Sequence, residues 1–179
     1  MKQDIRAQIE DSIRAFHLPR YNEIPNVGLY LEQVAKYISE YLEPLGDYGL
    51  TNSMISNYVK KGLVANPVKK QYDREQIAYL FFIAVAKTVL SLDALTGFID
   101  LQKRTYPLEI AYDYFCRQFE ALLQFTVELT DAMEISESYG IADTEQAGGK
   151  RLLYSCIVAV TQKIYLEKSL EAIASELKE

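Results

Sequence analysis

Apolar residues recur at intervals of three and four along most of the chain, a pattern typical of amphipathic α-helices. A first helix is predicted over residues 3–16, with one apolar stripe formed by Ile5, Ile9, Ile13 and Phe16. The segment from Leu18 to Pro25 is predicted to be a loop, because a residue that precedes proline disfavours the helical conformation.

A second helix is predicted to begin at Asn26, which can cap it, and to run to about Glu43, before Pro44 and Gly46. Its apolar face comprises Val27, Leu31, Val34, Ile38, Tyr41 and Leu42. A short third helix follows between Leu50 and Leu63, with several residues able to cap its start and a glycine at its end.

The third helix has two different faces. Its inward stripe is predicted to consist of Met54, Ile55, Tyr58 and Val59. Its outward face carries no acidic residue and consists of Asn52, Ser53, Ser56, Asn57, Lys60 and Lys61. Residues 64–71, which include a proline, alternate too briefly for a sheet core and predict a two-stranded ribbon or a tight loop.

The second half of the chain predicts further helices. Asp73 is expected to cap a helix over Gln76–Leu90 that is buried on most sides, and Ser91 to cap another that runs to about Lys103. Residues beyond 105 predict a helical hairpin, broken at Gly140 and around residues 148–149, with a heptad-like seam in each arm. The expected fold class is therefore all-α.

Charge is unevenly distributed along the 179 residues, which carry a net charge of −6. Residues 51–74 hold five basic side chains and one acidic one, whereas residues 75–179 hold nine basic and sixteen acidic ones. A single basic segment on an acidic protein leaves nucleic-acid binding open despite the overall charge.

The basic segment suits a DNA major groove, which accepts one helix whose polar side chains meet base edges while lysines neutralise phosphates. Asn52 and Asn57 would read adenine, and Ser53 and Ser56 would contact bases or phosphates. Contacts to the DNA backbone are predicted for Lys60, Lys61, Lys69 and Lys70. Tyr72 and Arg74 are predicted to lie at a flanking phosphate. An ordinary solvated helix face is the alternative interpretation of the same residues.

The sequence has few residues or motifs that would indicate an enzyme, a metal or cofactor site, or a membrane protein. His17 is the only histidine, and no Walker or dinucleotide-binding glycine motif is present, so we expect neither an enzyme nor a metal or organic cofactor. Cys116 and Cys156 are expected to be reduced, buried thiols. Because residues 1–16 lack an apolar signal core and no apolar run approaches about 18 residues, we expect a cytoplasmic protein without a membrane segment.

Two family resemblances bear on the basic segment. The order of elements over residues 26–90, with Lys-Lys-Gly-Leu-Val at residues 60–64 and Asp-Arg-Glu-Gln-Ile at 73–77, resembles the winged helix-turn-helix of MerR regulators. That resemblance implies phosphate contacts by Tyr58 and Tyr72, with core packing as the alternative for Tyr58. Residues 18–21, 29–34 and 51–80 resemble the bacterial domain of unknown function 1836 family, which has no assigned activity.

These observations predict a MerR-like winged helix-turn-helix domain over residues 1–90 and a helical dimerisation or effector region over 91–179. The expected function is that of a transcriptional regulator that binds palindromic double-stranded DNA as a homodimer. Tyrosines in the C-terminal half favour core or dimer packing over a pocket for a small-molecule effector. Such an effector is the second interpretation of these tyrosines. The alternative function is a helical interaction module or adaptor without DNA binding.

Overall fold

The computed structural model describes residues 13, 15–137, 158–159 and 162–163. Contacts group the chain into two compact units, one of residues 17–118 and one of residues 1–16 with 119–179. The first unit is described throughout, and it extends beyond residue 90 to include α5 and the first turns of α6.

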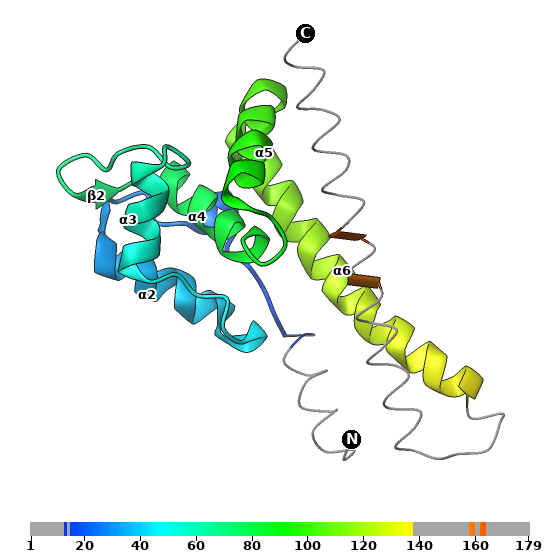
Figure 1. The fold of residues 1–179 in the computed structure, drawn as a ribbon. Coiled ribbons are helices and arrows are strands. Elements are labelled where there is room, and N and C mark those ends of the chain that lie inside the picture. The colour runs from blue at the N-terminus through cyan, green and yellow to red at the C-terminus, as the bar shows by residue number, and fades with distance from the viewer. Residues whose placement is uncertain (1–12, 14, 138–157, 160–161, 164–179) are drawn as a thin grey trace, which may run out of the picture. The chain divides into compact units, whose positions relative to one another are not determined.

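The fold is mainly α, as the sequence predicted, and Figure 1 shows its helices in chain order. The helices are α2 (Leu31–Leu42), α3 (Asn52–Lys60), α4 (Arg74–Ala86), α5 (Leu92–Thr105) and α6 (Leu108–Glu137), with short 3-10 turns η1 (Tyr21–Glu23) and η2 (Glu43–Leu45). Strands β1 (Leu29–Tyr30) and β2 (Gln71–Tyr72) pair antiparallel, with Leu29 opposite Tyr72.

Helix α2 begins five residues later than predicted. Leu29 and Tyr30 are extended because they pair with β2, so Tyr30 rather than Asn26 is the residue that caps the helix. The prediction that Val27 belongs to the apolar face is also wrong, since this side chain is exposed. From Leu31 onward the predicted face is confirmed, with Val34, Ile38 and Leu42 buried.

The start of α3 and the start of α4 are both fixed by capping side chains. The Thr51 hydroxyl accepts a hydrogen bond from the Met54 N–H at 3.2 Å, and Gly62, at φ 79°, follows the helix. At α4 the Asp73 carboxylate accepts from the Gln76 N–H at 2.9 Å, while the Gln76 side chain accepts from the Asp73 N–H at 2.8 Å. The predicted cap at Asp73 is therefore confirmed, although α4 ends at Ala86 instead of Leu90.

We expect Asp73→Ala to lower the free energy of unfolding by about 1 kcal/mol, because the substitution leaves the first-turn N–H groups of α4 without their acceptor. Urea unfolding followed by circular dichroism measures the change. Asp100→Ala, on the exposed face of α5, is the control and should change the stability by less than about 0.5 kcal/mol. Equal losses in the two variants would contradict the capping role.

Helix α4 is the centre of the 17–118 unit. It is buried on most sides, as predicted, and the rings of Tyr37, Tyr41 and Tyr112 lie around Phe81 with centroids 5.8, 5.8 and 6.4 Å away. Cys116 is buried in the first part of α6, which confirms the predicted environment of this thiol. The loop before β1 is tied to α6 by a 2.8 Å hydrogen bond from the Tyr21 N–H to the Asp113 carboxylate.

Several predictions lie wholly or mostly outside the described residues: the 3–16 helix, the second arm of the hairpin, the glycine breaks and the surroundings of Cys156. The first arm is α6, and its Phe119 meets Phe16 edge to face at 5.9 Å. Among the described residues, no helix combines the length and apolar character needed to cross a membrane. That part of the chain also holds no cluster of three or more metal-ligating side chains.

Candidate nucleic-acid interface

Helix α3 has the two faces that the sequence predicted. Ile55 and Tyr58 are buried, Met54 and Val59 are half-buried, and the helix packs against α2. The outward residues Asn52, Ser53, Ser56, Asn57, Lys60 and Lys61 are all exposed. Tyr58 is 7% exposed and belongs to the core, which was the alternative to a phosphate contact.

The polar side chains of this outward face differ in their local bonding. The Ser56 hydroxyl donates to the Asn52 carbonyl at 2.8 Å, and the hydroxyls of Thr51 and Ser53 lie 3.0 Å apart. The side-chain amides of Asn52 and Asn57 have no hydrogen-bond partner among the described residues. These two amides therefore keep the donor and acceptor pair that reads an adenine edge.

The basic segment continues in a tight turn, which we call the lysine turn, formed by residues 68–71. The Gln71 N–H donates to the Val68 carbonyl at 2.9 Å, and the Val68 N–H donates back to Gln71 at 3.1 Å. Lys69 and Lys70 occupy the two central positions with φ angles of 51° and 65°, the geometry of a type I′ turn. The sequence left open a ribbon or a tight loop, and the structure has a tight turn that ends in the short β1–β2 ribbon.

Lysine is unusual at both centres of such a turn, since asparagine and glycine tolerate the left-handed conformation far better. Each non-glycine residue held there costs on the order of 1 kcal/mol. Both lysines are exposed, so packing does not compensate for the strain. Strained backbone positions cluster at functional sites, so this turn is a candidate part of one.

Tyr72 and Arg74 are placed differently from the other predicted contact residues. Tyr72 is 4% exposed and pairs with Leu29 in the sheet. The Arg74 guanidinium donates to the Ile24 carbonyl at 2.9 Å and lies 5.5 Å above the Tyr21 ring. Arg74 therefore fastens α4 to the loop before β1, a structural role that the sequence did not predict.

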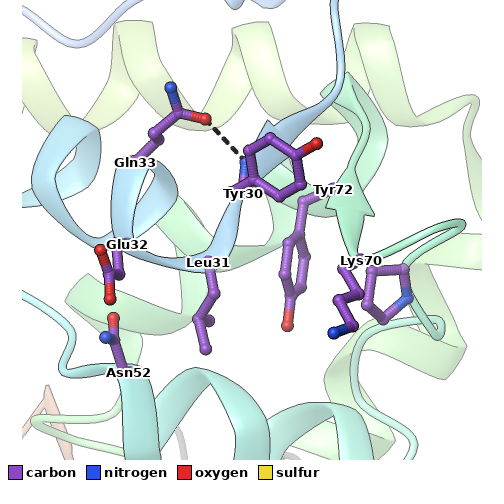
Figure 2. Close-up of a pocket in the computed structure, with 8 residues that line it drawn as sticks. Tyr30, Leu31, Glu32, Gln33, Asn52, Lys70 and Tyr72 are labelled. Carbon is purple, nitrogen blue, oxygen red and sulfur yellow. Dashed lines mark hydrogen bonds between the residues drawn. The ribbon is translucent and has the colours of Figure 1, made fainter.

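A shallow hollow of about 590 Å³ lies beside the lysine turn, where three separate segments meet (Figure 2). Its walls come from the start of α2, the first residue of α3 and the chain around β2, namely Tyr30, Leu31, Glu32, Gln33, Asn52, Pro67, Lys70 and Tyr72. Sequence reasoning missed the α2 residues, because a helix that begins at Asn26 would place them in its middle instead of at its open N-terminus.

Comparison with known proteins identifies one family. The model described as "Domain of unknown function (DUF1836)" matches residues 19–115, which is more than half of the chain and includes α2, α3, the lysine turn, α4 and α5. Searches of curated proteins and of solved structures find no match. The match covers nearly all of the compact unit of residues 17–118, and the chain therefore belongs to the domain of unknown function 1836 family.

Proposed function

We propose that this protein is a sequence-specific DNA-binding transcriptional regulator of the MerR-like winged helix-turn-helix type. The observation that carries the proposal is the outward face of α3, where six exposed polar or basic side chains lie opposite a packed apolar face and no acidic residue intervenes. A helix of this kind presents base-reading amides and phosphate-neutralising lysines on one surface.

The position of the lysine turn supports the same function. Asn52 at the start of α3 and Lys70 in the turn both line one hollow, so the helix and the turn border the same surface of the protein. In a winged helix-turn-helix, α3 would enter the major groove while the turn contacts the adjoining backbone.

The connection between α2 and α3 departs from the usual pattern. It spans Glu43–Thr51 and includes η2, whereas a helix-turn-helix ordinarily has a turn of about three or four residues. The likeness to MerR proteins therefore rests on the order of the elements and on the packing of α3 against α2.

A homodimer would bind a palindromic site, because two-fold symmetry of the protein is matched by symmetry of the operator. Support comes from α6, where the large apolar residues Ile110 and Tyr114 are 57% and 60% exposed one helical turn apart. Such exposed apolar side chains suit contact with a second copy.

The proposal is tested by several rounds of selection of the full-length protein on random-sequence duplex DNA. We expect a palindromic motif to be enriched and its binding to weaken as salt increases. If no sequence is enriched, the DNA-binding proposal fails. The acidic balance of residues 75–179 would then favour the alternative, an adaptor that binds a basic protein partner.

Because the lysine turn is strained, we expect its substitution to raise the stability of the protein and to lower its affinity for DNA. Lys69→Asn/Lys70→Gly should raise the free energy of unfolding by about 1 kcal/mol, because both new residues tolerate positive φ. The same variant should bind the selected duplex at least about tenfold more weakly, since two phosphate-neutralising charges are removed. Urea unfolding and fluorescence anisotropy measure the two effects.

Lys69→Arg/Lys70→Arg is the matched control for the turn. It keeps both charges and the same strain, so neither stability nor DNA affinity should change by much. An Asn-Gly variant that binds DNA as tightly as the wild type would exclude a role for the turn in binding.

A further inference from the structure

The chain reaches the start of α3 through the long connection from α2, Glu43–Thr51. The first part of this connection is folded by local bonds, from the Gly46 N–H to the Glu43 carbonyl at 3.0 Å and from the Tyr48 N–H to the Gly46 carbonyl at 2.9 Å. Glu43, Gly46 and Asp47 are exposed. Local bonds in an exposed loop do not fix where the next helix begins, so the position of α3 depends on contacts closer to its first residue.

Lys87, the residue that follows α4, makes such a contact. Its side-chain Nζ donates a hydrogen bond of 2.7 Å to the Gly49 carbonyl, two residues before Thr51, which caps α3. Hydrogen bonds from a charged donor are stronger than those between neutral groups. The bond therefore ties the end of α4 firmly to the last part of the connection.

The surroundings of Lys87 differ from those of a solvated lysine. Lys87 is half-buried, whereas every other lysine that the structure describes is exposed. Burial lowers the pKa of Lys87 below its usual value, and the Asp47 carboxylate opposes this shift. Because burial of a cation is unfavourable unless it is paired, the bond to the Gly49 carbonyl offsets part of that cost. The side chain is directed at the protein's own backbone.

Gly49 also approaches α2 closely. A Cβ atom at this position would lie 2.6 Å from the Ser39 Oγ and 3.4 Å from the Ser39 Cβ. Glycine is the residue that permits this approach without a shift of its neighbours. The chain at Gly49 is therefore in contact with both Ser39 of α2 and Lys87 at the end of α4.

From Gly49 the chain leads directly into the candidate DNA surface. Leu50 is 3% exposed, and Thr51 then caps the helix. Asn52 and Ser53 follow in the first turn of α3, and both are exposed. Side chains that recognise a ligand must be held to within about 0.5 Å of their binding geometry. A contact that fixes Gly49 thus fixes the end of α3 that carries these two residues.

We propose that Lys87 is a positioning residue for DNA binding, which holds the start of α3 against α2 and α4 through its bond to Gly49. The inference rests on the proposed DNA binding and adds to it a residue that acts through α3 instead of through the duplex. A lysine that contacted a DNA phosphate would also be needed for affinity, but its removal would change the salt dependence of binding. The two roles of Lys87 can therefore be told apart.

The decisive variant is Lys87→Met in the full-length protein, which keeps an apolar stem and removes the donor. We expect about tenfold weaker binding to the selected palindromic duplex, measured by fluorescence anisotropy, with an unchanged slope of log K against log salt. A slope reduced by about one per half-site would show a phosphate contact and overturn the positioning role. Lys87→Arg should restore most of the affinity, because a guanidinium can donate to the same carbonyl.

Gly49→Ala tests the same position from the side of α2. The added methyl group would meet the Ser39 Oγ and displace the connection, so DNA binding should again weaken. Gly49→Ala/Ser39→Ala removes that oxygen and should regain affinity. Wild-type affinity in Gly49→Ala alone would contradict the need for a fixed position at Gly49.

Thr88→Ala is the matched control, since Thr88 is the next residue and its hydroxyl donates to the Val85 carbonyl at 2.8 Å within the end of α4. Its DNA affinity should change by less than about twofold. Backbone amide NMR signals of the protein without DNA provide a second readout. Lys87→Met should shift the signals of residues 49–55 and Thr88→Ala should not, whereas a variant that is only less stable keeps the native signals there.

Two failures are distinguishable in these experiments. If the wild type binds no duplex, the proposed function is wrong, and with it any role of Lys87 in DNA binding. If the wild type binds a selected duplex and Lys87→Met binds it equally well, or leaves the signals of residues 49–55 in place, the protein is a DNA-binding protein and the positioning role alone is overturned.

Discussion

Replacement of both lysines at the end of α3, Lys60→Glu/Lys61→Glu, is expected to weaken binding to the selected duplex by at least about 100-fold. Both side chains are exposed where α3 ends, and the helix packs through Ile55 and Tyr58 on its other face. Under the proposed function, the substitution would remove two phosphate contacts and put two negative charges opposite the DNA backbone. Fluorescence anisotropy at two salt concentrations measures the loss.

A second basic pair in the same compact unit provides the control. Lys103 and Arg104 lie exposed in the last turn of α5. Lys103→Glu/Arg104→Glu makes the same change in net charge and should weaken binding by less than about threefold, because distant charges are screened at physiological salt. Equal losses from the two double substitutions would mean that overall charge, and not the α3 face, determines binding.

Truncation of the ring at the centre of α4 should have the largest effect on stability. Phe81 is fully buried and contacts the rings of Tyr37, Tyr41 and Tyr112, which come from α2 and α6. Phe81→Ala leaves a cavity among these rings and is expected to lower the free energy of unfolding by about 4 kcal/mol. Urea unfolding followed by circular dichroism measures the change.

Tyr106→Ala is the matched aromatic control, since this residue is 64% exposed between α5 and α6. Its removal should cost less than about 0.5 kcal/mol. A loss below about 1 kcal/mol for Phe81→Ala would contradict the central position of α4 in the packing of this unit.

The elements that local signals define could be predicted from the sequence. The caps at Thr51, Asp73 and Ser91 bond to backbone groups three residues away, so their effect is contained in a few neighbouring positions. The two faces of α3 follow from helical periodicity and needed no information from the rest of the chain. The resemblance to the domain of unknown function 1836 family is confirmed, while the likeness to MerR proteins stays a proposal.

The start of α2 depends on contacts that no local pattern contains. Val27, Leu31 and Val34 have helical spacing, yet Leu29 and Tyr30 are held as a strand by residues more than forty positions away. Pairing between distant segments overrides the local preference there. The same pairing exposes the N-terminus of α2 and thereby creates the hollow.

The residues of the candidate site could be predicted where only their exposure to solvent was in question. Asn52, Ser53, Ser56, Asn57, Lys60, Lys61, Lys69 and Lys70 are all at the surface, as the polar pattern indicated. Tyr72 and Arg74 could not be placed, because Tyr72 is buried within β2 and the Arg74 guanidinium is bonded to the Ile24 carbonyl. The positive φ angles of the lysine turn run against residue preference, so no propensity would predict them.

The most direct test of DNA binding by this surface is the change in backbone amide NMR signals of the full-length protein on titration with the selected duplex. We predict that the shifts concentrate in residues 51–61 and 68–72, with little change in α5. Absence of shifts at excess duplex, or shifts confined to residues outside α3 and the lysine turn, would contradict the account.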